Sequence, residues 1–400
     1  MAVNKFDNSM FDAGTIGTTA NKLLQLDGST KIPAVDGSLL TGIPSSFTKS
    51  ASDPTVSTNP SGGVGTLWIN TTSGEAYCCT DATAGSNVWI NVGAGSGNIQ
   101  PYHMHTSSNY GYILGAIPSS NVIERFSFSS DGNGVDVGDL PANQYFGAGC
   151  SSTTHGYEAG GADGSAHGWQ IDIYKVSFAT ATAAGTTVGD LTQRRGGNAG
   201  CSSSSYGYSS AGQLTPPYPG DLSYNIIDKF SFATDGNATD VGDLTISSSS
   251  RGGMSDVSYG YVTGGRIAGQ PVYNVIERFS FTSDGNASDV GDLLETLERG
   301  GTSESATHGY SSGGRVGGTA STDRIQKFAW GSSSNATDVA NLINSTTNEA
   351  SGGCGSASYG YNNGGYMVNI IQKYSFSSDS NATDVGDMLS AKAATANAQY

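Results

Sequence analysis

The chain has 400 residues, of which 58 are glycine and only 13% are charged, and its formal net charge is −16. This acidity excludes binding to a nucleic-acid backbone through bulk electrostatics, and no apolar run approaches the roughly 18 residues of a membrane-spanning helix. Because Gly, Ser, Thr, Asn and Tyr dominate while strong helix formers are scarce, we expect an all-β chain of short strands and tight turns.

The first hundred residues differ from the rest of the chain. Residues 1–45 show no sustained helical or strand period, so we expect an extended arm that gains order by packing on another molecule. Residues 46–97 are predicted to hold a Ser/Thr/Pro-rich linker, over 46–60, and a small β-module of three short strands. The aromatic residues expected in its core are Trp68, Tyr77 and Trp89.

Beyond residue 97 the sequence repeats with a period of about 50 residues. The Gly-Tyr dipeptide recurs six times, starting at Gly111, Gly156, Gly207, Gly260, Gly309 and Gly360. Each copy is followed by an apolar-aromatic segment such as VIERFSF, whose alternation is typical of a half-buried strand. A turn of the type DGNATD and the motif VGDL come next, and an Arg-Gly-Gly leads into the following copy at Arg195, Arg251 and Arg299.

A repeat of four short strands cannot bury both faces of its own sheet, but a ring of such sheets can. Six copies therefore predict a six-bladed β-propeller over residues 98–400. The first copy has no strand before its Gly-Tyr segment, so the last strand of the chain is expected to complete it. Ala393-Ala394 align with Gly196-Gly197 and support this closure, although residues around His103 to His105 compete for the same place.

The five cysteines do not suggest a disulfide framework, because their number is odd and the chain is long. Cys150, Cys201 and Cys354 each precede a Gly-Tyr dipeptide by six residues, and Met254 occupies the same offset in another copy. We interpret this offset as a repeated core position of small or medium apolar side chains, and no metal site is predicted there.

The repeat resembles the kelch repeat, in which a strand ends in a double glycine and an Arg lies downstream. The matching glycines are Gly264-Gly265, Gly313-Gly314 and Gly364-Gly365, and the kelch tryptophan of the outer strand is missing. The phrases ANKLLQLDGSTKIPAVDGSLLTGI and GTLWINTTSGEAYCCTD resemble N-terminal portions of fibre and virion proteins of marine bacteriophages. This likeness implies a virion structural protein of the tail fibre or spike type.

No catalytic arrangement stands out, since most acidic residues occupy repeat-equivalent positions, and we expect neither an enzyme nor a cofactor. His103 and His105 lack an identified third ligand for a metal. The turns offer oxygen ligands at calcium-like spacing, for instance Asp235, Asn237 and Asp240. A β-turn without an ion explains the same letters, because the second copy turns without any of these ligands.

Three insertions that break the repeat are better candidates for binding: Gly161 to Gln170, Gln213 to Tyr224 and Arg266 to Asn274. All follow the strand that begins with Gly-Tyr, so we expect them on one rim of the propeller. The aromatic residues that they offer to a receptor are Trp169, Tyr218, Tyr224 and Tyr273. Packing of these rings on neighbouring blades is an equally acceptable interpretation.

The sequence thus predicts a virion protein that binds other virion proteins through residues 1–97 and presents the propeller to a host cell-surface glycan or protein. A homo-oligomer is expected, with a trimer favoured for a fibre. Two alternatives remain open. One is a capsid decoration or fibre protein without a receptor role, and the other is a bacterial kelch-type carbohydrate-binding protein.

Overall fold

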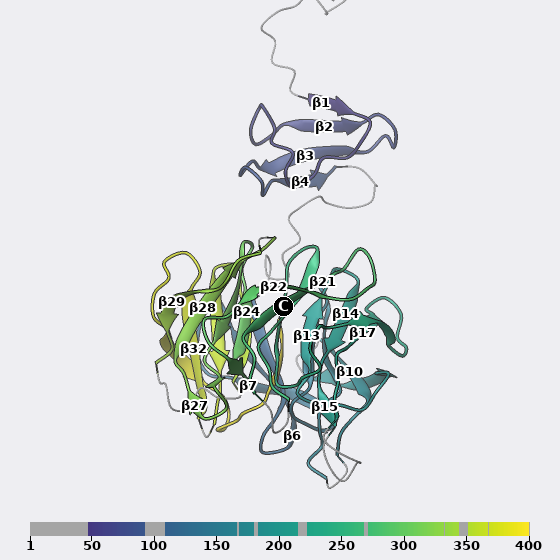
Figure 1. Cartoon of the computed structure of the whole chain (residues 1–400). Coiled ribbons are helices and arrows are strands. Elements are labelled where there is room, and N and C mark those ends of the chain that lie inside the picture. The colour runs from purple at the N-terminus through teal and green to yellow at the C-terminus, as the bar shows by residue number, and fades with distance from the viewer. Residues whose placement is uncertain are drawn as a thin grey trace, which may run out of the picture. The chain divides into compact units, whose positions relative to one another are not determined.

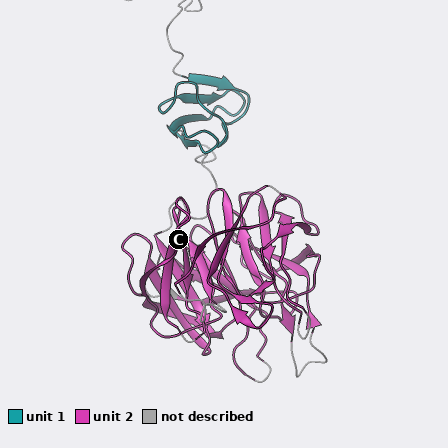
Figure 2. Ribbon diagram, turned by 60° about the vertical axis from the view of Figure 1, so that its left-hand side comes forward, with its two compact units in different colours: residues 1–101 teal, residues 102–400 magenta. Residues whose placement is uncertain are grey.

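The computed structural model describes residues 47–92, 109–165, 168–179, 183–214, 222–267, 271–331, 333–343, 351–366 and 368–399. These residues form strands, turns and loops and contain no helix, so the all-β prediction is confirmed for them (Figure 1). The chain divides into two compact units, residues 1–101 and residues 102–400 (Figure 2). The predicted extended arm, residues 1–45, lies outside the described residues.

Unit 1 is a single four-stranded sheet in the order β1-β2-β3-β4. Its strands are β1 (Phe47–Ser50), β2 (Leu67–Asn70), β3 (Ala76–Asp81) and β4 (Val88–Asn91). The prediction of three strands preceded by a linker is wrong for β1, which pairs in parallel with β2. The segment after β1 also packs on the sheet, because Trp68 Nε1 donates to the Ser52 carbonyl and Asn87 Nδ2 to the Val56 carbonyl, each at 2.9 Å.

Unit 2 contains six sheets built on one plan, which we number I to VI in chain order. Sheet I consists of β34 (Ala396–Gln399), β5 (Tyr110–Ala116), β6 (Ser120–Ser127) and β7 (Val135–Gln144), with β11 (Ala183–Ala184) added at its edge. Sheet II consists of β8 (Ala148–Ser151), β9 (His155–Ala159), β10 (Asp172–Ser177) and β12 (Thr186–Asp190). Sheet III consists of β13 (Ala199–Ser202), β14 (Tyr206–Ser210), β17 (Ile226–Ser231) and β18 (Thr239–Asp243).

The other three sheets follow the same order. Sheet IV consists of β19 (Gly252–Ser255), β20 (Tyr259–Thr263), β21 (Val275–Ser280) and β22 (Ser288–Asp292). Sheet V consists of β24 (Gly301–Glu304), β25 (His308–Ser312), β28 (Arg324–Ala329) and β29 (Thr337–Asn341). Sheet VI consists of β30 (Gly352–Gly355), β31 (Tyr359–Asn363), β32 (Ile370–Ser375) and β33 (Thr383–Asp387). Short extra strands sit in connections: β15 (Gln213–Leu214), β16 (Leu222–Ser223), β23 (Leu297–Glu298), β26 (Arg315–Val316) and β27 (Ala320–Ser321).

The first strands of the six sheets contact one another in a closed cycle, β34-β8-β13-β19-β24-β30 and back to β34. The first strand of sheet I is the C-terminal strand, which pairs with β5 through Ala396↔Leu114 and Asn397↔Ile113. The expected closure by the end of the chain is therefore confirmed. Ala394 also has a positive φ of 55°, as does the aligned Gly197 at 68°.

Neighbouring sheets are joined by a repeated aromatic contact. The tyrosine of each Gly-Tyr packs on the aromatic residue that ends the apolar segment of the next sheet, at centroid distances of 4.6 to 4.8 Å and with ring planes 24° to 38° apart. The pairs are Tyr112–Phe178, Tyr157–Phe232, Tyr208–Phe281, Tyr261–Trp330, Tyr310–Phe376 and Tyr361–Phe128. The sixth pair joins sheet VI to sheet I, so the aromatic contacts close the cycle as the first strands do.

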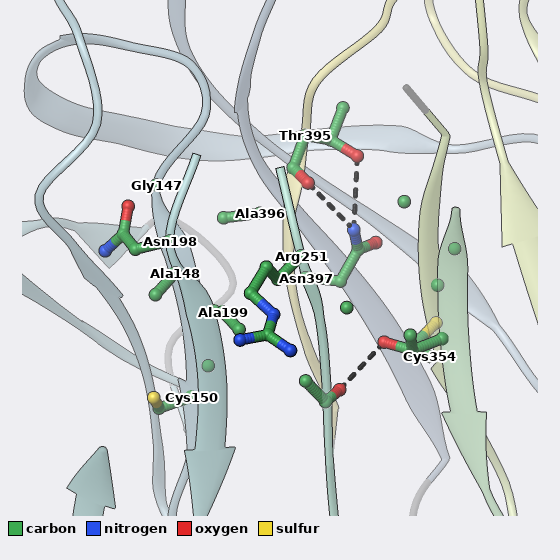
Figure 3. Close-up of a pocket in the computed structure, with 18 of the residues that line it drawn as sticks. Gly147, Ala148, Cys150, Asn198, Ala199, Arg251, Cys354, Thr395, Ala396 and Asn397 are labelled. Carbon is green, nitrogen blue, oxygen red and sulfur yellow. Dashed lines mark hydrogen bonds between the residues drawn. The ribbon is translucent and has the colours of Figure 1, made fainter. Parts of the chain in front are cut away.

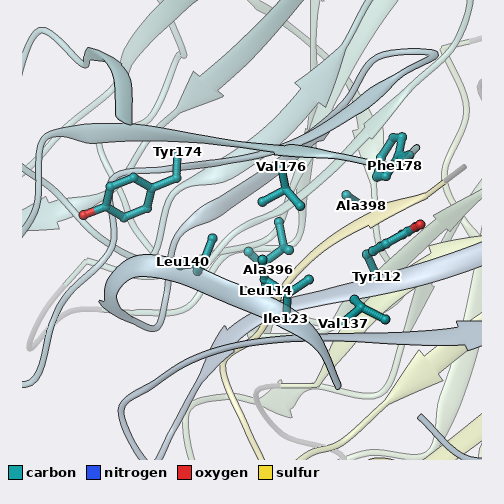
Figure 4. Packing of buried hydrophobic residues seen from close by; sticks show 10 residues of the cluster. All are labelled: Tyr112, Leu114, Ile123, Val137, Leu140, Tyr174, Val176, Phe178, Ala396 and Ala398. Atoms are coloured by element: carbon teal, nitrogen blue, oxygen red, sulfur yellow. The ribbon is translucent and has the colours of Figure 1, made fainter. Parts of the chain in front are cut away.

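The glycine of the Gly-Tyr dipeptide is explained by the same packing. In sheet III, Gly207 lies opposite Phe230, and a Cβ on Gly207 would overlap the Phe230 ring. Because the glycine has no side chain, the Phe230 ring lies across it and extends into the space between sheets. Figure 4 shows the resulting packing between sheets I and II, where Leu114, Ile123 and Ala396 of sheet I meet Val176 and the rings of sheet II.

Removal of residues 393–400 should unfold unit 2 at a markedly lower temperature than the full chain. The deletion takes away β34, exposes the edge of β5 and breaks the contacts of the first strands of sheets II and VI with β34. We expect a loss of at least about 3 kcal/mol of unfolding free energy, comparable with large core deletions. Calorimetry measures this, and the transition of unit 1 serves as an internal control. An unchanged unit 2 transition would contradict the closure.

Candidate functional site

The first strands of the six sheets surround a cavity of about 150 Å³ (Figure 3). Its wall is mostly backbone and small side chains, because neighbouring first strands approach closely. A Cβ on Gly200 would overlap the Gly149 carbonyl, and one on Gly253 would overlap the Gly200 carbonyl. At roughly 30 Å³ per water, the cavity has room for about five water molecules. Pockets for drug-sized ligands measure about 300–1,000 Å³, so this cavity is small for a ligand of that size.

A belt of hydrogen bonds runs round this cavity. The backbone N–H that follows the repeated Cys position donates to a side chain of the neighbouring sheet, at 2.7 to 3.0 Å. The pairs are Gln399 to Ser151, Ser151 to Ser202, Ser202 to Ser255, Ser255 to Glu304, and Gly355 to Gln399. The polar side chains of the wall therefore hold neighbouring sheets together.

One mouth of the cavity is bridged by a cation and a ring. The Arg299 guanidinium lies 5.4 Å from the centroid of Phe146. These residues precede the first strands of sheets V and II, which are opposite one another in the cycle. Both have a positive φ, 59° in each case, and both line the cavity. The contact is of the cation–π type and partly covers the mouth.

Behind the first strands, buried cations in the connections that lead into these strands form ion pairs with the third strand of the same sheet. Arg195 Nη1 lies 3.0 Å from Asp228 Oδ2, and neither side chain is exposed. Arg251 pairs with Glu277, and Lys392 with Glu124, in equally buried surroundings. Burial lowers the pKa of both arginines, and the opposite charge of Asp228 or Glu277 acts against this shift.

These pairs correct one expectation from the sequence. Arg195, Arg251 and Arg299 were expected as equivalent parts of an Arg-Gly-Gly motif. They lie at different distances before the residues that pair with the Gly-Tyr tyrosines, namely Cys201, Met254 and Ser303. Only the first two arginines form the buried pair with the third strand of the next sheet, whereas Arg299 reaches the cavity mouth.

The acidic partner also accepts a hydrogen bond from the preceding sheet. Asp228 accepts from the Thr192 backbone N–H at 2.8 Å, and Glu124 accepts from the Leu389 N–H at 3.0 Å. In sheet V this position is Gln326, whose amide oxygen accepts the corresponding hydrogen bond from the Leu294 N–H at 2.8 Å. This third-strand position therefore needs a hydrogen-bond acceptor in these sheets. The acceptor is a charged carboxylate where a buried cation lies opposite it.

Sheet II contains a buried carboxyl group without such a cation. Glu158 is fully buried, and its carboxyl oxygens have no hydrogen-bond partner among the described residues. Its methylene and carboxyl atoms occupy the space where a side chain on Gly147 would lie. Burial raises the pKa of Glu158 well above its ordinary value, so the neutral acid is the favoured form in this environment.

The repeated sulfur position is a packing position, as predicted. Cys150, Cys201, Met254 and Cys354 are buried, and each pairs across strands with the tyrosine of its Gly-Tyr dipeptide. Burial raises the pKa of Cys150 to about 12, so this thiol is not a nucleophile near neutral pH. The structure shows all five cysteines as free thiols.

The turn motif DGNATD joins neighbouring sheets. In sheet III, Asp235 forms an ion pair with Lys175 of sheet II at 2.8 Å, and Asn237 Oδ1 accepts from the Asp190 N–H at 3.1 Å. Asp240 is the second residue of β18 and accepts from the Gly242 N–H at 3.2 Å. Calcium binding, the alternative left open above, therefore competes with these bonds. The described residues contain no group of three or more His, Cys, Asp or Glu that could hold a metal, and His103 and His105 lie outside them.

Three of the four candidate receptor residues are described, and all three are half-buried. The Trp169 ring lies over Gly196, where a Cβ would overlap it. Tyr224 and Tyr273 share one repeat position, and their N–H groups donate to Gly212 and Gly265 at 2.8 Å. The fourth residue, Tyr218, lies outside the described residues. Trp169, Tyr224 and Tyr273 belong to connections between the second and third strands of sheets II to IV, at one end of these sheets.

Sequence reasoning missed the cation–π contact at the cavity mouth and the buried Glu158. Phe146 and Arg299 occupy one repeat position, at which other copies have the small residues Gly197, Ser250 and Ala394. The repeat alone does not predict that opposite copies contact each other. Glu158 carries a clearer signal, since EAGG follows its Gly-Tyr where the other copies have a small, polar or aliphatic residue.

Comparison with known proteins identifies a similar fold and no protein family. No protein-family model matches the sequence, and no curated protein matches it significantly. Among solved structures, the one titled "Structure of YjhT" is similar, with a TM-score of 0.54 and 10% identity over 64% of this chain and 87% of that chain. YjhT is a β-propeller, and at this identity the likeness shows the fold alone. No helix among the described residues is long and apolar enough to cross a membrane.

Replacing Arg195 by Met should destabilise unit 2 by about 3–5 kcal/mol, because Asp228 then stays buried and charged without its partner. The double change Arg195→Met with Asp228→Asn should restore at least half of this loss. Asn still accepts the Thr192 N–H and, like Gln326 in sheet V, carries no charge. Urea unfolding of the two variants measures both effects. Equal stability of the single and double variants would contradict the pairing.

Replacing Glu158 by Gln should make the stability of unit 2 less dependent on pH. The pKa of Glu158 is raised in the folded state, so its contribution is fully present at low pH. It is lost as the pH rises from the ordinary pKa of 4.5 through the folded value. We expect equal melting temperatures for Glu158→Gln and the natural chain at pH 4, and a higher one for the variant at pH 8. A difference that is the same at both pH values would point to packing alone.

Proposed function

We propose that the chain is a non-enzymatic structural and adhesive protein of a bacteriophage virion, of the tail fibre or spike type. In this proposal sheets I to VI are the blades of a six-bladed, kelch-like propeller over residues 98–400. The propeller presents a rim to a host-surface glycan or protein, and residues 1–97 attach the chain to other virion proteins.

The observation that carries the recognition role is the placement of the irregular connections. The connections within sheets II, III and IV leave the same end of three adjacent sheets, and they are the parts of the chain that break the repeat. Loops held by a rigid scaffold are the common location of binding residues. The cavity between the first strands is small, which favours contact with a large receptor on the outer surface.

The ion pairs of unit 2 support a structural scaffold without catalytic activity. The buried cations Arg195, Arg251 and Lys392 each pair with a carboxylate on the third strand of the sheet that they lead into. The acidic residues of the turns are paired across sheets. Charges used in this way stabilise the ring and are not available as an acid–base pair.

Unit 1 offers a surface for contacts between copies of the chain. Phe47 of β1 and Leu67 of β2 are neighbours in the parallel pair, with exposed fractions of 42% and 39%. Exposed apolar side chains side by side favour burial in an assembly. This supports a homo-oligomer, with a trimer proposed for a fibre, and display of several propellers would add weak contacts into useful avidity.

A second candidate function is a capsid decoration or fibre protein without a receptor role. The half-burial of Trp169, Tyr224 and Tyr273 favours it, because rings that pack on their own scaffold have less surface for a partner. The bacterial kelch-type carbohydrate-binding protein remains a third possibility, and virion proteomics distinguishes it from the first two.

Alanine at Trp169, Tyr218, Tyr224 and Tyr273 together should lower adsorption of particles to host cells by at least about tenfold, since recognition rests on a few aromatic anchors. Tyr206→Ala with Tyr359→Ala is the matched control, because these tyrosines are 38% exposed and begin strands at the other end of the sheets. Adsorption counts and particle yield are measured together. Unchanged adsorption would favour the decoration role, and failed assembly would show that these residues serve the particle itself.

A further inference from the structure

The third strand of each sheet carries one partly exposed cation, and the repeat provides a carboxylate for it. Four lysines pair with the aspartate that opens the DGN-type turn of the next sheet, at 2.6 to 2.8 Å. The pairs are Lys175–Asp235, Lys229–Asp284, Lys327–Asp379 and Lys373–Asp131. Each aspartate follows the stacked aromatic residue by three positions, as in Phe281 to Asp284.

In the two remaining sheets the cation is an arginine and the carboxylate is missing. In sheet II, which follows the sheet of Arg125, the corresponding segment is ATATAAGTT, and in sheet V, which follows the sheet of Arg278, it is GSSSNAT, so neither sequence contains an acidic residue. Residues 180–182 and 332 of these segments lie outside the described part of the chain. At three positions after Trp330, sheet V has Ser333. No ion pair of Arg125 or Arg278 occurs among the described residues, although every lysine at this position has one.

Both arginines lie over a tyrosine ring, as do two of the paired lysines, Lys229 at 4.5 Å from the centroid of Tyr206 and Lys373 at 4.4 Å from that of Tyr359. The Arg125 guanidinium lies 4.4 Å from the centroid of Tyr110, and that of Arg278 lies 4.4 Å from the centroid of Tyr259. A guanidinium stacked on a ring keeps its edge free for donation in the plane. A preorganised cation of this kind loses little conformational entropy when it binds an anion.

The turn of sheet V lies beside Arg278. Trp330 stacks on Tyr261 at 4.7 Å, the Gly331 N–H donates to the Tyr261 hydroxyl at 3.2 Å, and Tyr261 is the cross-strand partner of Arg278. The Tyr261 hydroxyl also donates to Asp256 and interacts with the Arg278 side chain. The neighbours on the surface are hydroxyl side chains, with Ser288 opposite Arg278 in the strand pair and Ser333 exposed in the turn.

We propose that Arg278 with Tyr259, and Arg125 with Tyr110, form two binding sites for the carboxylate of an acidic saccharide such as a uronate. The ligand carboxylate takes the place that the aspartate of the next sheet occupies in the four paired copies. Guanidinium and carboxylate match in a bidentate geometry. The serine hydroxyls around Arg278 are suited to sugar hydroxyls and offer no apolar pocket for a peptide side chain.

The two sites lie in sheets I and IV, which are opposite one another in the cycle, and at the end of the sheets that carries the turns. They are therefore separate from the rim of the second-to-third strand connections, and the inference does not depend on the proposed receptor role of that rim. A polymeric acidic ligand carries many carboxylates, so that one polymer can bind sites on neighbouring copies of the chain. This raises its apparent affinity.

Binding of polygalacturonate to the purified full chain, measured by calorimetry at low salt, tests the proposal. The protein carries a net charge of −16, so a polyanion does not bind it through bulk attraction. We expect binding that needs free carboxylates, with fully methyl-esterified polygalacturonate as the uncharged comparison. Arg125→Gln with Arg278→Gln should weaken binding at least tenfold, and Lys229→Gln in a paired copy should leave it unchanged.

Two further variants change the carboxylate and leave the arginines intact. Ser333→Asp restores the aspartate of the repeat beside Arg278, so it should remove one of the two sites. Asp284→Ser frees Lys229 and should add binding capacity. Both changes are on exposed turns, and unchanged melting temperatures confirm the fold. An absence of binding by the natural chain, or equal binding by the natural chain, the double arginine variant and Ser333→Asp, overturns the proposal. Neither result bears on host adsorption through the rim.

Discussion

The structure of unit 2 depends on the stacked contact between the tyrosine of one sheet and the terminal aromatic residue of the next. This contact buries the face that no single sheet could cover alone, and it occurs at every junction, including Tyr361–Phe128 between the last sheet and the first. Polar bonds accompany it at the same junction, since Lys373 pairs with Asp131 and Asn133 accepts from the Asp387 N–H. Because sheet I contains both β5 and the C-terminal β34, the ring forms only when distant parts of the chain have met. Stability is then shared by all sheets rather than held in one core.

The order of the ring explains why so many conspicuous residues have a structural role. Aspartate and asparagine of the turns, which resemble calcium ligands in the sequence, bind the neighbouring sheet. Buried arginines of the Arg-Gly-Gly segments neutralise acidic side chains of the third strand that follows them. The cavity wall is fixed by backbone contact between strands that carry glycine. Function on such a scaffold has to arise at positions where one copy differs from the others.

The fold could be predicted from the sequence to an unusual extent, because repetition supplies six independent readings of the same strand pattern. The Gly-Tyr dipeptide, the repeated cysteine position and the closing C-terminal strand were all recognisable, and β34 pairs as expected. Strand β1 was missed, since Phe47 to Ser50 looks like the start of a Ser/Thr/Pro-rich linker and its partner β2 lies beyond it in the chain. The Phe146–Arg299 contact could not be predicted either, because it joins opposite members of the ring. Contacts between neighbouring copies follow from one repeat, whereas contacts across the axis do not.

The choice between lysine and arginine on the third strands shows how repeats separate structural from binding roles. A lysine ammonium is a compact charge that suits a single aspartate, and it occurs at this position only where the next turn supplies one. Arginine occurs in the two copies whose next turn lacks the aspartate, and there the guanidinium is stacked on a tyrosine. If the loss of the aspartate had no functional consequence, there would be no reason for arginine to replace lysine in the same two copies. The paired substitution supports the proposal that this cation is kept for a partner outside the chain. The tyrosine ring orients the cation with or without the aspartate, since Lys229 and Lys373 also lie over a tyrosine.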